Sequence, residues 1–274
     1  MIDPFISVVM PNYNAGKFLK FSIESVLGQT YKNFEFIIVD DCSTDDSWEI
    51  IQRYQSKDSR IIALRNEKNM DISFTLNKGI EIAKGNYIAR FDGDDICFLN
   101  RFERQMDFLS KPENRDIGVL GANLELIDFE GKVTGQKKFP EHHEDIVSAI
   151  WYRNPFAHNT VIIKKDLFKK YGNYDVDLNK VEDLDLWFRF MNGTRFNNMQ
   201  ENLVSYRVSG TNSVIANQRK MIDLGNYVRG KYHREYQVKM PLKYHIFVFS
   251  TKVAKFLPRK FVFWLFNKVH SFFK

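Results

Sequence analysis

The first half of the chain alternates short apolar runs with segments whose apolar residues recur at helical spacing. Each run is short and is closed by turn-forming residues, which is typical of buried strands. The strands are expected at residues 6–10, 34–39, 60–64 and 86–91, and the helices at 18–27, 45–55 and 71–83. This alternation predicts an α/β fold in which a mostly parallel sheet carries helices on its faces.

The second half is less regular. We expect a hairpin that begins at 117–128 and turns at Glu130–Gly131, short strands at 160–163 and 203–208, and helices at 146–152, 165–170 and 182–191. Beyond Ser213 the pattern is helical to the end, interrupted at Pro241 and Pro258. We therefore predict one α/β domain over residues 1–215, followed by a helical, basic and aromatic tail over residues 216–274.

The net charge of +6 comes from the end of the chain, because residues 241–274 hold seven Lys and Arg and no Asp or Glu. The rest is close to neutral, which argues against a nucleic-acid binder with basic charge spread over a working face. In residues 259–274 the apolar positions recur at helical spacing, and this basic, Phe-rich pattern is typical of a helix on a membrane surface. The alternative is a helix packed on the first domain or on a second subunit, which leaves a homo-oligomer open.

Cysteine use and hydropathy indicate a cytoplasmic protein. Cys42 and Cys97 form no disulfide framework and lack zinc-type spacing, so a reducing compartment is expected. The chain opens on a strand-like run without a basic leader, and no apolar stretch is long enough to span a bilayer. We expect a cytoplasmic location, with residues 241–274 as a peripheral contact on the inner face of the membrane.

Acidic clusters follow two of the four strands expected in the first half. Asp40–Asp41 comes after the second run, and Asp92–Asp95, with the sequence DGDD, comes after the fourth. Open parallel sheets bind ligands beyond the carboxyl ends of their strands, so both clusters lie where a ligand is expected. Carboxylates one residue apart can hold Mn²⁺ or Mg²⁺ with positions open for phosphate oxygens. The alternatives are a solvated turn for DGDD and, for the first cluster, a helix N-cap formed by Ser43 or Thr44.

A third polar segment, Pro11-Asn12-Tyr13-Asn14, follows the first run. Tyr13 offers an aromatic surface on which a nucleobase can stack. A simple turn is the alternative, because Pro-Asn and Asn-Ala-Gly are sufficient for one.

Together these segments resemble a known family. The stretches SVVMPNYN, FEFIIVDDCSTDDS and GNYIARFDGDD are similar to motifs of the family 2 glycosyltransferases, which have the GT-A fold. The resemblance implies a nucleotide-sugar donor whose nucleobase contacts Asp40 and packs on Tyr13. It further implies that Asp92 lies near the ribose and that Asp94 binds the Mn²⁺ or Mg²⁺ ion at the diphosphate.

The same resemblance implies supporting roles for other residues. Pro11 and Asn14 would belong to the donor loop, while Asp41 and Asp95 would support the donor site. Arg207, in the last expected strand, would pair with phosphate, with a surface role as the alternative.

The segment VEDLDLW resembles the helix start that carries the family's catalytic base. The resemblance implies that Asp183, beside Glu182, takes the proton of an acceptor hydroxyl and that a single displacement inverts the anomeric centre. The alternative is a purely structural helix, in which the acidic residues are stabilised by the helix dipole at the N-terminus and Asp185 pairs with Arg189. His158 is similar to a residue that lines the acceptor side, although a lone His before a strand is more often structural.

The resemblance therefore implies a glycosyltransferase that moves one sugar from a UDP-sugar or another nucleotide sugar to a glycan or lipid-linked glycan, in cell-surface polysaccharide synthesis. Chain extrusion is not expected, because the processive members carry a Gln-x-x-Arg-Trp signature where residues 218–221 read QRKM. Two rival functions remain. One is a sugar-nucleotide nucleotidyltransferase, although the Gly-rich basic loop it needs after the first strand is missing; the other is a non-catalytic glycan- or nucleotide-binding module.

Overall fold

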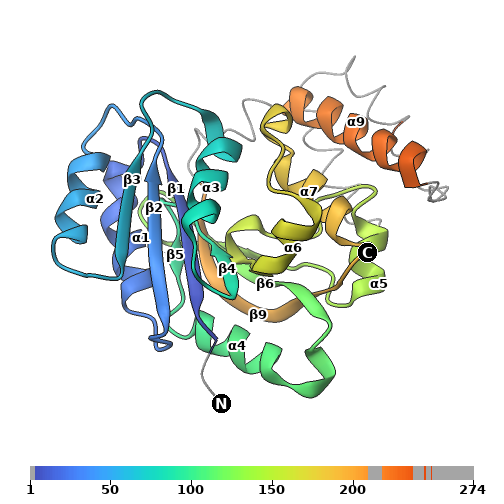
Figure 1. The fold of residues 1–274 in the computed structure, drawn as a ribbon, viewed down its shortest axis with the longest axis horizontal. Coiled ribbons are helices and arrows are strands. Elements are labelled where there is room, and N and C mark those ends of the chain that lie inside the picture. The colour runs from blue at the N-terminus through green and yellow to red at the C-terminus, as the bar shows by residue number, and fades with distance from the viewer. Residues whose placement is uncertain (1–3, 209–217, 237–243, 245–247, 249–274) are drawn as a thin grey trace. The chain divides into compact units, whose positions relative to one another are not determined.

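A computed structural model of the chain describes residues 4–208, 218–236, 244 and 248 (Figure 1). The chain divides into two compact units, Met1–Asn212 and Ser213–Lys274. In the second unit, helix α9 (Gln218–Tyr236) buries Val228 and Tyr232, which lie one turn apart. Apart from Tyr244 and Val248, the rest of the basic tail lies outside the described residues, and the expected membrane contact of residues 241–274 lies there with it. Within the described part of the chain, no helix is both long and apolar enough to cross a membrane.

The described strands of the first unit form one nine-stranded sheet in the order β3-β2-β1-β4-β8-β6-β9-β5, with β7 paired to β6. Their bounds are β1 Ile6–Asn12, β2 Phe34–Asp40, β3 Ile61–Arg65, β4 Tyr87–Arg90, β5 Ile96–Cys97, β6 Ile117–Ile127, β7 Val133–Lys137, β8 Ile162–Lys164 and β9 Arg195–Arg207. Strands β1 to β4 pair in parallel, as predicted. The second half is mixed, because β8 is antiparallel to β4 and β6, whereas β6 and β9 are parallel.

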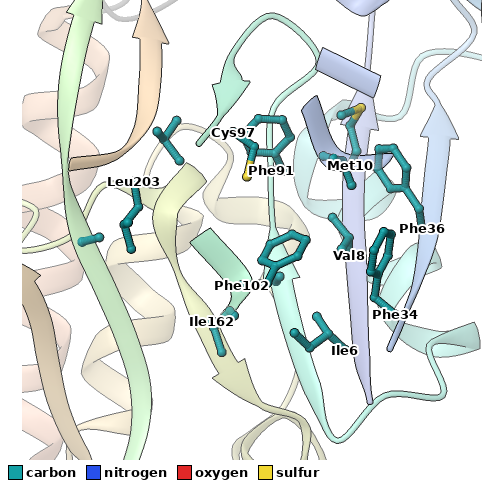
Figure 2. Close-up of a cluster of buried hydrophobic side chains, with 14 of the residues drawn as sticks. Ile6, Val8, Met10, Phe34, Phe36, Phe91, Cys97, Phe102, Ile162 and Leu203 are labelled. Carbon is teal, nitrogen blue, oxygen red and sulfur yellow. The ribbon is translucent and has the colours of Figure 1, made fainter. Parts of the chain in front are cut away.

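The helices of this unit cover both faces of the sheet. They are α1 Gly16–Leu27, α2 Ser47–Gln55, α3 Asp71–Ile82, α4 Arg101–Ser110, α5 His143–Ala149, α6 Lys165–Tyr171 and α7 Glu182–Phe190. Alternate residues of a strand point to opposite faces. Ile6, Val8 and Met10 of β1 therefore join the buried cluster that includes residues of α1, α2 and α4 (Figure 2). Val9 points the other way, towards α3, where a Cβ added to Gly79 would lie 2.6 Å from the Val9 side chain.

Three local predictions are wrong. β9 spans Arg195–Arg207 rather than 203–208, because parallel pairing with β6 supplies hydrogen bonds to a polar stretch of low strand propensity. Helix α4 was not predicted at all, although one of its faces is buried. Helix α2 begins at Ser47 without a side-chain cap, so neither Ser43 nor Thr44 has the predicted capping role.

Candidate active site

The carboxyl ends of β1, β2 and β4 lie side by side at one edge of the sheet. The register pairs Asn12 with Asp40 across β1 and β2, and Val9 with Arg90 across β1 and β4. The loops that follow parallel strands meet at this edge. They are the segments PNYN, DDCST and DGDD, so the structure brings together the three polar segments that the sequence singled out.

Asp40, at the end of β2, is a buried structural group. Its side chain is 0% exposed, and its Oδ1 accepts hydrogen bonds from Asn12 Nδ2 (2.9 Å) and Ser43 Oγ (2.5 Å). Its Oδ2 accepts a hydrogen bond from the Ser43 amide (3.0 Å) and lies 3.2 Å from Arg65 Nε. A carboxylate offers about four lone-pair positions, so this one has none left for a ligand. The geometry therefore argues against the nucleobase contact expected for Asp40.

Replacing Asp40 with Ala is expected to lower the free energy of unfolding by about 3 kcal/mol, because it strands the buried donors of Asn12 and Ser43. Chemical denaturation measures this loss. Glu201→Ala is the control: it breaks an exposed ion pair with Arg104 and should cost less than about 1 kcal/mol. An Asp40→Ala protein as stable as the wild type would contradict the structural role.

Asp41, the next residue, has one oxygen to spare. Its Oδ1 accepts hydrogen bonds from Asn66 Nδ2 and from the Met70 amide, both at 2.8 Å. Asn66 is itself held, since its Oδ1 accepts from Lys78 Nζ (3.0 Å). Among the described residues, none donates a hydrogen bond to Asp41 Oδ2. The carboxylate is thus anchored through one oxygen and can offer the other to a single donor.

The loop after β1 leaves Tyr13 50% exposed beside the half-buried Pro11. Asn14 adopts a φ of 51°, in the left-handed region that Asn tolerates. Its Oδ1 accepts from the Thr44 amide (2.8 Å), and its own amide donates to Ser43 Oγ (3.0 Å). These bonds tie the loop after β1 to the loop after β2, and the exposed ring is free for stacking.

The DGDD loop packs against the end of β1. A Cβ added to Gly93 would lie 2.9 Å from Asn12 Oδ1, so a larger residue would force the loop away from β1. Asp92 forms an ion pair with Arg90, the last residue of β4. Asp95 is 0% exposed and accepts hydrogen bonds from the Arg207 amide (2.9 Å) and from Asn159 Nδ2. These contacts suit the supporting role expected for Asp95.

Asp94 is the least engaged carboxyl of this loop, since no other side chain among the described residues donates a hydrogen bond to it. Burial and the Asp92 carboxylate raise the pKa of Asp94 to about 6, against the opposing charges of Arg90 and Arg207. A divalent cation would relieve this crowding of negative charge. The carboxylate oxygens of this loop are ligands that suit Mn²⁺ or Mg²⁺, and these ions complete their coordination with phosphate and water. The described residues contain no group of three or more His, Cys, Asp or Glu that could hold a metal alone.

Arg207 connects the DGDD loop to the turn between β6 and β7. It is 4% exposed, its Nε donates to the Asp94 carbonyl (3.0 Å), and its Nη1 donates to the carbonyls of Asp128 (3.0 Å) and Phe129 (3.2 Å). The guanidinium carbon also lies 4.2 Å from the centre of the Phe18 ring. In this arrangement Arg207 shapes the loop, and its contact with phosphate stays a prediction.

Glu182 and Asp183 open helix α7, where the helix dipole favours negative charge. Burial and the Asp183 carboxylate raise the pKa of Glu182 to about 7. Burial also raises the pKa of Asp183, and a hydrogen bond from Asn154 opposes that rise. The ion pair between Asp185 and Arg189, which the structural interpretation of this helix predicts, is present with 2.8 Å between Asp185 Oδ2 and Arg189 Nε. That ion pair involves neither Glu182 nor Asp183, and among the described residues neither of the two forms an ion pair.

His158 is half-buried against Tyr174, whose Oη lies 2.7 Å from His158 Nε2. Burial and the nearby charge of Arg90 hold the pKa of His158 well below its usual value, so the imidazole is neutral. The hydrogen bond to Tyr174 is a contact within the fold and does not test a role in acceptor binding. The role of His158 on the acceptor side stays a prediction.

Arg90 links the two sets of carboxylates, and the sequence analysis missed it. It is 5% exposed and pairs with Asp92. Its positive charge also lowers the pKa values of Asp94, Glu182 and Asp183, which places all of them within its electrostatic reach. The sequence did contain a signal for Arg90, which is an arginine inside an apolar strand. A charge buried in this way needs partners, so its position points to a polar site.

Two solved structures have the same fold. S. aureus TarS in complex with UDP superposes with a TM-score of 0.62 at 21% identity, covering 81% of this chain and 64% of that one. Mannosyltransferase PcManGT from Pyrobaculum calidifontis, in complex with GDP-Man and Mn²⁺, gives a TM-score of 0.66 at 15% identity, covering 94% and 72%. This chain thus spans slightly less than two thirds of the TarS fragment. The fold is that of the GT-A glycosyltransferases, as the sequence predicted.

The family is shown by sequence. The model described as "Glycosyl transferase family 2" matches residues 7–171. Glycosyltransferase MJ1057 of Methanocaldococcus jannaschii is 36% identical over 225 residues, 80% of this chain and 76% of that protein. The O-antigen biosynthesis glycosyltransferase WbnJ of Escherichia coli is 34% identical over 209 residues, 74% of this chain and 79% of that protein. The chain belongs to glycosyl transferase family 2.

Proposed function

We propose that the chain is an inverting glycosyltransferase that moves one sugar from a UDP-sugar to a hydroxyl of a glycan or lipid-linked glycan. The observation that carries this proposal is the ion pair of the buried Arg90 with Asp92 in the DGDD loop, together with the electrostatic influence of Arg90 on Asp94, Glu182 and Asp183. Asp92 and Asp94 are the donor pair, and Glu182 and Asp183 are the acceptor pair. A role in cell-surface polysaccharide synthesis is supported by WbnJ, which is named for O-antigen biosynthesis.

In this reaction the acceptor oxygen attacks the anomeric carbon while the bond from that carbon to the diphosphate oxygen breaks. Asp183 takes the proton of the acceptor hydroxyl, so the products are the glycoside, the nucleoside diphosphate and a protonated Asp183 carboxyl. Attack opposite the leaving diphosphate inverts the anomeric centre. Asp94 would hold Mn²⁺ or Mg²⁺, which would supply neutralising charge for the diphosphate, and PcManGT with GDP-Man and Mn²⁺ supports this choice.

The free oxygen of Asp41 favours a uracil base over guanine. Uracil presents one N–H group on its imide edge, which needs one acceptor. Guanine presents two parallel N–H donors, which suit a carboxylate with both oxygens free. Because Asn66 and the Met70 amide occupy Oδ1, Asp41 matches the single donor, and we assign it the base contact first expected of Asp40. Tyr13 would stack on the same base, and TarS in complex with UDP supports this nucleotide.

Titration calorimetry with UDP, dTDP, CDP and GDP, each with and without Mn²⁺, tests the donor site. UDP is expected to bind best, followed by dTDP, which has the same imide edge. In Asp41→Asn, the donors from Asn66 and Met70 hold the amide oxygen and turn its NH₂ towards the base. UDP affinity should then fall about tenfold or more, while CDP, whose ring nitrogen accepts, should gain.

Asp46→Asn is the matched control, since it removes the same charge from an exposed position of the same loop. Tightest binding of GDP would overturn the nucleotide assignment. A folded protein that binds no nucleotide would favour the glycan-binding module, and synthesis of a nucleotide sugar from a nucleoside triphosphate would favour the nucleotidyltransferase.

A further inference from the structure

The side chain of Asn154 bridges two residues of helix α7. Asn154 lies in the segment between α5 and the turn at His158. Its Nδ2 donates to Asp183 Oδ2, and its Oδ1 accepts from Trp187 Nε1 at 3.2 Å. The Phe156 amide donates to the same Oδ1 at 3.3 Å. One amide group is therefore held by three partners.

The identity of these partners determines which way the amide points. An indole N–H and a backbone N–H can only donate, so the atom that faces them must be the oxygen. The NH₂ group is then left to face the carboxylate of Asp183. In the flipped amide, the NH₂ group of Asn154 would meet two donors and its oxygen would meet a carboxylate, so all three contacts would become repulsive.

Trp187 makes this orientation rigid. It lies four residues after Asp183 on α7, so the two side chains occupy one face of the helix and both reach the Asn154 amide. The indole is 0% exposed and packs against Phe156, with ring centres 5.0 Å apart, and against His158, at 5.9 Å. A buried indole held in this way cannot move its N–H group without disturbing the core.

The Asp183 carboxylate is in turn held at both oxygens. Oδ1 accepts from the Leu184 amide at 2.7 Å, and Oδ2 accepts from Asn154. Each oxygen makes one such bond, so lone pairs remain to receive a proton. The hydrogen bond from Asn154 also stabilises the ionised form, which is the form that acts as a base.

We propose that Asn154, aligned by Trp187, is a positioning residue that holds the Asp183 carboxylate in the orientation from which it takes the acceptor proton. This inference rests on the proposed function, in which Asp183 is the base. The sequence offers no local signal for this role, because a single Asn before Pro155 is typical of a turn.

In Asn154→Ala we expect kcat to fall about ten- to a hundredfold, with the KM for the donor unchanged, because only the base is affected. The acid limb of the kcat/KM profile should move to higher pH, since the hydrogen bond from Asn154 lowers the pKa of Asp183. The ionisable groups around Asp183 are Glu182 on α7, Arg90 at the end of β4 and Tyr174 before the turn at 176–178. The substitution leaves all of them in place.

Trp187→Phe provides the sharper test, because it removes the indole N–H and keeps an aromatic ring. It should lower kcat in the wild type but not further in Asn154→Ala, since the N–H acts only through the amide. A role in packing alone would instead lower kcat equally in both backgrounds. Asn114→Ala is the control, because this distant amide donates only to the Phe108 carbonyl and its loss should leave kcat unchanged.

A folded Asn154→Ala enzyme with the wild-type kcat and acid limb would overturn the inference. If that variant does not fold, Asn154→Asp, which is nearly the same size, replaces it and should show the same losses. Asp183→Asn separates this inference from the proposed function. Full activity in Asp183→Asn would refute the base itself, whereas an inactive Asp183→Asn beside an unaffected Asn154→Ala would refute only the positioning role.

Discussion

Asp183→Asn is expected to lower turnover about a thousandfold while leaving UDP affinity unchanged. The amide cannot take the proton of the acceptor hydroxyl, and general-base catalysis typically contributes a factor of about 10² to 10⁴. Donor affinity should persist because Asp183 lies on α7 and is not part of the loops after β1, β2 and β4 that we assign to the donor. Steady-state kinetics with a UDP-sugar, together with calorimetry of UDP, measures both quantities.

The pH profile of the wild type belongs to the same prediction. Burial raises the pKa of Glu182 to about 7 and also raises the pKa of Asp183, so the protonated, inactive pair predominates on the acid side. Activity should therefore rise as the pH increases from the acid side towards neutral and the pair loses its protons. Because Glu182 and Asp183 titrate together, the acid limb of the pH profile reports the titration of the pair and not of either residue alone. Wild-type turnover in Asp183→Asn would show that the base lies elsewhere.

Asp94→Asn is expected to abolish the dependence of donor binding on Mn²⁺ and to lower turnover about a thousandfold. A metal ion stabilises the charge on the departing diphosphate by several kcal/mol. Each 1.4 kcal/mol lost from this stabilisation lowers the rate by a factor of about ten. The variant keeps the size of the side chain and removes the charge that attracts the ion. Calorimetry of UDP with and without Mn²⁺ measures the first effect, and steady-state kinetics measures the second.

Asp166→Asn is the control for this charge change. It lies on α6 with its side chain 91% exposed, and its loss should alter neither metal dependence nor turnover. If Asp94→Asn still bound UDP more tightly with Mn²⁺ than without, the metal ligand would have to be sought elsewhere in the loop, with Asp92 the first residue to test.

The nucleobase contact that we propose for Asp41, in place of Asp40, marks the limit of what motifs can predict. Both residues follow the same buried strand, and the sequence cannot say which carboxylate has free oxygens. The difference arises because Asn12 and Arg65, distant in the chain, converge on Asp40. Hydrogen bonds between residues brought together by strand pairing leave no local trace in the sequence.

The sequence by itself determined the α/β class, the parallel order of the first strands and the three polar loops at their carboxyl ends. These features depend on hydrophobic periodicity and on turn-forming residues, which are local properties. The tertiary structure alone decided how Asn154 is aligned and how far β9 extends, because each depends on contacts between residues far apart in the chain. A buried charge or amide acquires its role only from the partners that folding brings to it.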